Sequence, residues 1–102
     1  ADMYGINQLL LDMCDRFASK HYDEDNVEIY FNYDLIENKV IFRLKKDDTF
    51  RYYEIYYDDI YSGKIESSDE ILNNLDILAE DLLKELEMRR LENGSTRFKN
   101  NR

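Results

Sequence analysis

The chain has 102 residues, 43% of them hydrophobic, and its single cysteine excludes an intrachain disulfide or a multi-cysteine metal site. Residues 1–88 hold 22 acidic and 9 basic residues, a net charge of −13, whereas residues 89–102 hold 1 acidic and 5 basic, a net of +4. The acidic part disfavours direct nucleic-acid binding and favours a basic protein surface as partner. Because no apolar run approaches the roughly 20 residues that span a bilayer and no signal peptide is recognisable, we expect a cytoplasmic protein and no membrane partner.

The first expected element is a helix over about residues 4–20. Its apolar residues recur at three- and four-residue spacing, which is the period of an amphipathic helix: Ile6, Leu9, Leu10, Met13, Cys14 and Phe17. The polar stretch from His21 to Asn26 ends this pattern, and His21 is expected to interact with the helix C-terminus rather than act as a base. Cys14 falls on the apolar stripe, so we expect a buried hydrophobe and not a nucleophile.

Three strands are predicted next, over residues 27–34, 39–46 and 49–57, because apolar and polar residues alternate there. Turns are expected near Glu37-Asn38 and at Asp47-Asp48. In the third strand, strict alternation places Phe50, Tyr52, Glu54 and Tyr56 on one face. We expect that face to turn toward the helices, so that the opposite face is left open with Tyr53, Tyr57, Tyr30, Ile41 and Ile55.

Residues 58–66 form either a short fourth strand or a loop, and a long second helix of about 24 residues follows. A capping box of Ser67 and Glu70 begins this helix, and Asn93-Gly94 fits a C-terminal cap. We therefore predict an α+β fold: a three- to four-stranded antiparallel meander with an N-terminal and a long C-terminal helix on one face (α-β-β-β-α). Residues 1–94 are expected to form one domain and residues 95–102 a basic, flexible tail.

The acidic residues do not match a complete calcium motif. The stretch Asp23–Asp25 resembles part of an EF-hand loop, but the sixth and twelfth positions are Glu28 and Asp34 instead of Gly and Glu. No Gly-rich phosphate loop occurs either. We therefore expect no metal and no cofactor.

Asp25 followed by Glu37-Asn38-Lys39 resembles the metal-binding pattern of restriction-type nucleases. In that family two carboxylates hold magnesium and the lysine positions or activates the attacking water. Here Glu37-Asn38 is expected in a hairpin turn, whereas the family carries its motif along a strand. We expect a protein that is not an enzyme, and keep a metal-dependent nuclease as the more remote alternative.

Residues 50–64 read FRYYEIYYDDIYSGK and contain five tyrosines. Tyrosine combines a rigid apolar ring with a hydroxyl group that tolerates water, and it is enriched among the residues that dominate protein interfaces. An exposed aromatic patch on the open face of the sheet therefore indicates an interaction surface. The alternative is that these rings only pair across strands and stabilise an open sheet.

Small size, strong acidity, α-β-β-β-α order and many Tyr and Asp residues make the chain resemble small phage inhibitor proteins of the anti-CRISPR and DNA-mimic type. Those proteins occupy the basic nucleic-acid-binding site of a host protein such as a CRISPR nuclease. The resemblance implies a non-enzymatic inhibitor in the host cytoplasm. It also implies phosphate substitutes at Asp23, Glu24, Asp25, Glu54, Asp58 and Asp59, and anchors at Tyr53, Tyr57 and Tyr61. The alternative is a homodimeric structural or regulatory module that pairs through the second helix or the tyrosine face.

Overall fold

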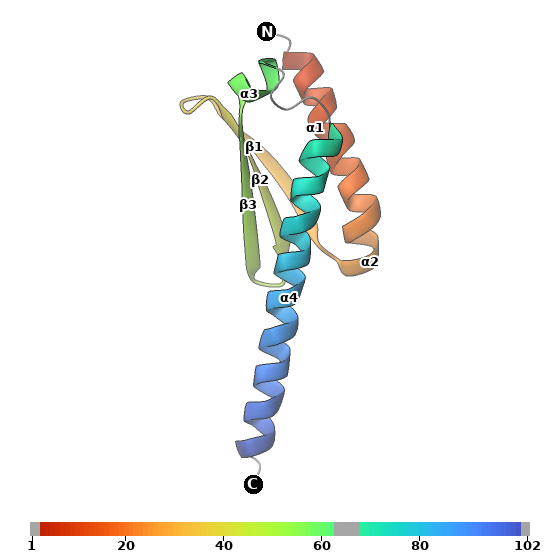
Figure 1. Cartoon of the computed structure of the whole chain (residues 1–102), viewed down its shortest axis with the longest axis vertical. Helices are drawn as coiled ribbons and strands as arrows, with labels where there is room; N and C mark the ends of the chain where they lie inside the picture. The colour runs from red at the N-terminus through yellow and green to blue at the C-terminus, as the bar shows by residue number, and fades with distance from the viewer. Residues whose placement is uncertain (1–2, 63–67, 101–102) are drawn as a thin grey trace.

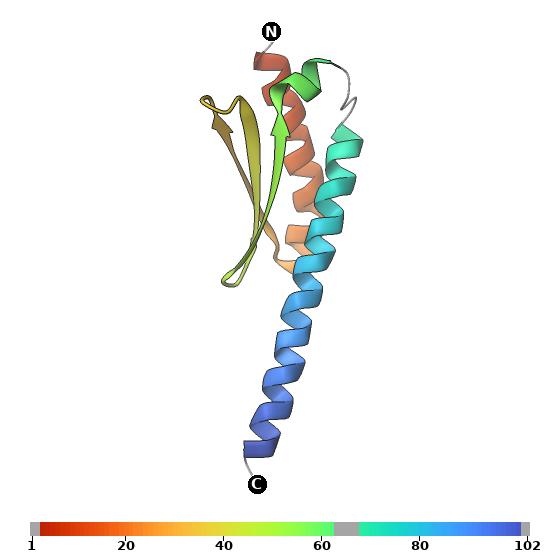
Figure 2. The same cartoon turned by 60° about the vertical axis from the view of Figure 1, so that its left-hand side comes forward.

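The computed structural model describes residues 3–62 and 68–100 of the chain (Figure 1). In chain order its elements are α1 (Met3–Phe17), the π-helical turn η1 (Ala18–Tyr22), α2 (Asp23–Asp25), β1 (Glu28–Asp34), β2 (Lys39–Lys46), β3 (Thr49–Tyr56), α3 (Tyr57–Tyr61) and α4 (Ser68–Asn100). The strands form one antiparallel sheet in the order β1-β2-β3, and α1 and α4 lie side by side on one of its faces (Figures 1 and 2). The predicted α+β architecture is confirmed.

The core lies between the two helices and the covered face of the sheet. Residues of β1 and β2 face it as the alternation predicts, since Val40, Phe42 and Leu44 are fully buried. Apolar residues of α1 and α4 close the core from the other side: Ile6, Leu10, Met13, Phe17, Ile71, Leu75, Ala79 and Leu82. Burial of this one contiguous cluster holds the sheet and the helices together.

The two faces of the third strand are exchanged relative to our prediction: the residues expected on the covered face lie on the open one. A two-residue turn at Asp47 and Asp48, with Asp47 at φ 56°, makes Lys46 the partner of Thr49. Residues directly opposed across an antiparallel pair point to the same side of the sheet. Two pairs therefore share the covered face, Phe42 with Tyr53 and Val40 with Ile55, and the open face receives Phe50, Tyr52, Glu54 and Tyr56.

The N-terminal helical path continues through η1 and α2 to Asp25, about five residues beyond the predicted end. Asn26 then adopts the left-handed conformation at φ 59°, and its amide donates to the carbonyl of Tyr22 at 3.0 Å. His21 lies in the last turn of η1, near the helix end where we expect it. Its side chain is buried inside η1, and its Nε2 lies 2.7 Å from the Asp76 carboxylate of α4.

The second helix, α4, also runs further than predicted. It spans 33 residues and passes through Gly94 to Asn100, so the expected cap at Asn93-Gly94 is wrong. A glycine inside a helix costs only about 1 kcal/mol relative to alanine, and no proline follows to stop the helix. The end of α4 projects beyond the sheet (Figure 1). As a result the radius of gyration is 17.0 Å, against about 13 Å for a compact chain of this length.

Two further predictions concern the segment between β3 and α4. Residues 57–61 form the short helix α3 and not a strand. Residues 63–67, which include the rest of the predicted fourth strand and the capping residue Ser67, lie outside the described residues.

Candidate interaction surface

The face of the sheet opposite α1 and α4 is not covered by any described element (Figure 2). One row across the three strands consists of Tyr30, Arg43 and Tyr52, which are directly paired. Four aromatic side chains on this side are exposed: Tyr30 by 43%, Phe50 by 37%, Tyr52 by 59% and Tyr56 by 48%. We use the name open face for the surface formed by Tyr30, Ile41, Arg43, Phe50, Tyr52, Glu54 and Tyr56.

Cationic side chains lie over the rings of the open face. The guanidinium carbon of Arg43 is 4.9 Å from the ring centroid of Tyr30 and 5.5 Å from that of Phe50. Lys39 Nζ lies 5.9 Å from the centroid of Tyr56. Such cation–π contacts limit the rotamers of both groups, so less conformational entropy is lost when a partner binds. The surface combines tyrosine and arginine, two of the residue types that dominate binding energies at interfaces.

The turn between β1 and β2 presents two aliphatic side chains at the end of the open face. Leu35 is 77% exposed and Ile36 is 95% exposed. The Asp34 carboxylate accepts hydrogen bonds from the amides of Ile36 at 3.1 Å and Glu37 at 2.9 Å, which fixes the turn. We call Leu35 and Ile36 the hairpin tip.

Acidic residues lie at both ends of the sheet. At the end beside the hairpin tip, Asp58 and Asp59 belong to α3, whose first amide, that of Tyr57, donates to the carbonyl of Asn38 at 3.0 Å. At the opposite end, the exposed Asp47 and Asp48 form the β2–β3 turn. The surface therefore has an aromatic centre with carboxylates at both ends.

Glu54 belongs to the open face itself. Its carboxylate forms an ion pair with Lys39 at 3.1 Å, and this hydrogen bond raises the pKa of the Lys39 ammonium. Glu54 is 47% exposed in this pair, so it still offers part of its carboxylate to solvent.

Two predicted anchors do not lie on the open face. Tyr57 is 2% exposed, and its ring stacks on Tyr33 with centroids 6.2 Å apart and an interplanar angle of 11°. Tyr53 is half-buried against the core, and its hydroxyl accepts a hydrogen bond from Asn74 Nδ2 at 2.8 Å. The prediction that these two rings lie on the open face is wrong, because the β2–β3 register points them at the helices. The third predicted anchor, Tyr61, ends α3, and its side chain lies outside the described residues.

The six predicted phosphate substitutes do not form one cluster. Asp23, Glu24 and Asp25 belong to α2, near the β2–β3 turn, where Lys46 Nζ donates to the Asp25 carbonyl at 2.5 Å. Asp58 and Asp59 follow the far end of β3, whose eight residues span roughly 25 Å. Glu54 lies between these two groups on the open face.

An open aromatic face was predicted from the sequence, but the residues that β3 contributes to it and the hairpin tip were missed, although the sequence contains a signal for each. The two-residue turn Asp47-Asp48 sets the register of β3 and therefore the side on which Tyr52 lies. Leu35 and Ile36 are two adjacent aliphatic residues next to a predicted turn, where neither side chain can pack against the covered face of the sheet. Six of the twelve large hydrophobic residues that are exposed in the described part of the chain belong to these two features: Tyr30, Leu35, Ile36, Phe50, Tyr52 and Tyr56.

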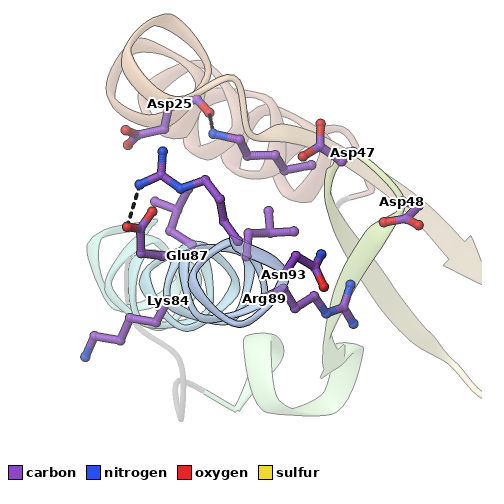
Figure 3. Close-up of a pocket in the computed structure, with 11 residues that line it drawn as sticks. Asp25, Asp47, Asp48, Lys84, Glu87, Arg89 and Asn93 are labelled. Atoms are coloured by element: carbon purple, nitrogen blue, oxygen red, sulfur yellow. Dashed lines mark hydrogen bonds and ion pairs between the residues drawn. The ribbon is translucent and has the colours of Figure 1, made fainter. Parts of the chain in front are cut away.

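A groove of about 1000 Å³ lies between α2, the β2–β3 turn and α4 (Figure 3). Asp25, Asp47 and Asp48 line one side, and side chains of α4 line the other. The arginines of this groove already have partners, since Arg89 contacts Glu85 at 2.9 Å and Arg90 contacts Glu87 at 2.6 Å. The groove is lined by four acidic and four basic side chains, so it carries no net positive charge for an anionic ligand.

The residues considered for catalysis are not brought together. Asp25 precedes β1 and Glu37 follows it, so the two carboxylates of the nuclease-like pattern lie at opposite ends of that strand. Burial, with a smaller contribution from Asp15, raises the pKa of the Cys14 thiol to about 11, which keeps it protonated and poorly nucleophilic at neutral pH. Within residues 3–62 and 68–100, no three His, Cys, Asp or Glu side chains are grouped closely enough to hold a metal ion.

The membrane-spanning potential of the helices and the similarity to known proteins were also considered. None of the helices in the described ranges combines the length and the apolar character that crossing a bilayer requires. Searches of the chain against protein-family models, curated proteins and solved structures found no match.

Proposed function

We propose that the chain is a non-enzymatic inhibitor that binds a basic protein surface through its open face and hairpin tip. The observation that carries this proposal is the exposure of four aromatic rings and an arginine on one uncovered side of a small sheet. A monomeric protein rarely leaves such a patch uncovered unless it binds something there. The type of partner follows from the charge.

Aromatic rings beside an arginine can stack on nucleic-acid bases as well as dock on a protein. Binding of single-stranded nucleic acid also needs a positively charged surface along the backbone. The solvent side of the sheet carries three cationic residues, Lys39, Arg43 and Lys45, and three anionic ones, Glu28, Asp34 and Glu54. A locally neutral surface on a chain of net charge −9 gives no electrostatic attraction for phosphates, so a protein partner is favoured.

The target class is a host protein whose nucleic-acid-binding site is basic, such as a CRISPR nuclease in the host cytoplasm. The negative net charge attracts such a site over long range, and the carboxylates at the two ends of the open face meet its cationic rim. The aromatic centre then determines how slowly the complex dissociates. Inhibition results because nucleic acid and this chain compete for the same basic surface.

Tyr52→Ala is the first variant for the test, and Tyr22→Ala is its matched control. Tyr22 is exposed to a similar degree, 50% against 59% for Tyr52, but lies in η1 on the helical side. The probe is a purified bacterial RNA-guided nuclease, loaded with guide RNA and given a labelled DNA duplex. The assay measures how much chain is needed to displace the DNA.

The wild type and Tyr22→Ala are expected to displace the DNA equally. Tyr52→Ala should need about 30-fold more protein, which corresponds to the roughly 2 kcal/mol of a hot-spot tyrosine. Affinity should also fall as salt rises. If Tyr52→Ala displaces the DNA as well as the wild type, the open face is not the binding surface; if the wild type displaces none, this target class is wrong.

A further inference from the structure

The outer side of α4, which faces away from α1 and the sheet, carries an exposed apolar stripe. Ile77, Met88 and Leu91 are 57%, 61% and 60% exposed. Met88 and Leu91 follow Ile77 by 11 and 14 residues, close to three and four helical turns, so the three residues share one side of the helix. Leu75, Ala79 and Leu82 are fully buried on the opposite side.

The segment of α4 from Glu87 to Asn93 is exposed to solvent. Every side chain from Glu87 to Asn93 is exposed, which covers the full circumference of the helix. A helical segment of this length is marginally stable in water when nothing packs against it. A partner that covers the stripe at Met88 and Leu91 would stabilise this end.

The charge of α4 changes sign along its length. Residues 69–87 contain seven acidic residues and one basic residue, whereas residues 89–100 contain four basic residues and one acidic residue. Two copies of this helix placed in parallel would bring like charges together. Placed antiparallel, they bring the acidic segment of each copy alongside the basic segment of the other.

We propose that α4 pairs antiparallel with α4 of a second copy, about a twofold axis between Met88 and Leu91. Met88 of each copy then contacts Leu91 of the other, and four apolar side chains fill the centre of the contact. Residue 79 of one copy lies opposite residue 100 of the other, so the overlap is about 30 Å long. The contact is isologous and closes as a dimer, because both copies use the same surface.

This pairing is separate from the proposed inhibitory function. It covers the outer side of α4, whereas the open face lies beyond the sheet on the other side of the molecule (Figure 2). A dimer therefore presents two open faces and two hairpin tips. It would bind a target with two sites more tightly than a monomer does.

The first test measures the mass in solution by sedimentation equilibrium from about 1 to 100 µM, the range in which dimers of moderate affinity dissociate. The variant is Met88→Glu/Leu91→Glu. The matched control is Leu35→Glu/Ile36→Glu, which introduces the same charges at the hairpin tip. Both of these aliphatic side chains are more exposed than Met88 and Leu91. Circular dichroism of each variant establishes that it is folded.

The wild type and the hairpin control are expected at twice the 12.4 kDa chain mass, and Met88→Glu/Leu91→Glu at the chain mass. Rising salt should shift the wild type toward monomer, because charge pairing contributes to the contact. A wild type that is monomeric over the whole range overturns the proposal. So does a dimer that survives Met88→Glu/Leu91→Glu or is lost equally in the control.

The second test determines the orientation of the helices in a Cys14→Ala background. The proposed axis places residue 88 of one copy beside residue 91 of the other, so a mixture of Met88→Cys and Leu91→Cys should form a mixed disulfide faster than either variant alone. Faster self-crosslinking of Met88→Cys would show a parallel pair and overturn the proposal. Tyr52→Ala should remain dimeric, so the outcome does not depend on the inhibitory function.

Discussion

Asp76→Ala should destabilise the fold more than the removal of any exposed carboxylate of α4. The Asp76 carboxylate is 2.7 Å from His21 Nε2 and 3.1 Å from Lys20 Nζ, and its side chain is only 17% exposed. The His21 side chain is 5% exposed, so water cannot replace the lost partner without opening the contact between η1 and α4. The variant therefore leaves a buried imidazole nitrogen without its carboxylate.

A buried polar group left without its partner costs about 1–3 kcal/mol. The bond to Lys20 contributes less than about 1 kcal/mol, because Lys20 is 55% exposed. We expect the free energy of unfolding to fall by about 2–3 kcal/mol. That loss corresponds to a decrease in Tm of roughly 10–20 °C in a domain of this size.

Asp81→Ala is the matched control, since it removes the same side chain from the same helix. Asp81 is 64% exposed and contacts Arg51 Nε at 2.9 Å, and Arg51 keeps its second partner Glu85 at 2.8 Å. Its loss should cost less than about 1 kcal/mol. Urea unfolding followed by circular dichroism, at one fixed protein concentration, measures both variants. Equal losses in the two variants would refute the assignment of a structural role to the buried His21–Asp76 contact.

Three further predictions concern the register, the helix end and the thiol. Tyr57→Ala should lower the free energy of unfolding by about 3–5 kcal/mol, as truncation of a buried aromatic does, and Tyr56→Ala by less than about 0.5 kcal/mol. Urea unfolding measures both variants, and a larger loss in Tyr56→Ala would show that β3 has the opposite register, with Tyr56 on the covered face. Gly94→Ala should increase helical ellipticity and stability by up to about 1 kcal/mol, whereas a loss would indicate that α4 ends at a left-handed Gly94. The pKa of the Cys14 thiol is raised from 9.0 to about 11 in the folded chain. Between these pH values the thiol stays protonated in the folded chain and ionises in the unfolded chain. Stability should therefore fall as pH rises between about 9 and 11, and Cys14→Ala should remove that part of the slope in urea titrations at several pH values.

Local pattern was sufficient to predict β2 and nearly sufficient for β1 and β3. Residues 39–46 were predicted as a strand and form β2, because a regular alternation ends on both sides at residues that favour turns. Asn38 and Asp47 both adopt positive φ, 58° and 56°, which Asn and Asp tolerate better than most residues. Burial of Phe42 and Leu44 follows from the same alternation.

The faces of β3 could not be predicted from its own residues, because aromatic side chains alternate on both of them. Only the pairing with β2 determines that Tyr52 lies on the open face and Tyr53 on the covered face, and that pairing depends on the length of the turn. Among the described side chains of the stretch rich in tyrosine, the exposed rings are Phe50, Tyr52 and Tyr56, and not the predicted Tyr53 and Tyr57. In such a strand, register has to be derived from the turn before any surface is assigned.

The longer N-terminal helical path depends on a partner distant in sequence. His21 and Asp25 belong to a polar stretch that ends the apolar pattern, and local propensity gives no reason to continue the helix. Asp76, 55 residues later, supplies the carboxylate that pairs with Nε2 of the buried imidazole. Tertiary contacts of this kind override local pattern, and a single sequence does not reveal them.

The basic end of α4 poses a problem for a binder that recognises basic surfaces. Residues 89–102 carry a net charge of +4, and a segment of that charge would compete with the target for the acidic residues of another copy. In the proposed dimer this segment lies along the acidic part of the partner's α4, so its charge is neutralised where it cannot reach the open face. The exposed carboxylates of Asp47, Asp48 and Asp58 lie outside this helix contact and can still meet the target. Loss of the dimer should therefore weaken target binding at low salt by more than the loss of bivalency alone explains. A monomeric variant that also lacks residues 95–102 should recover the additional loss, because the competing basic segment has been removed.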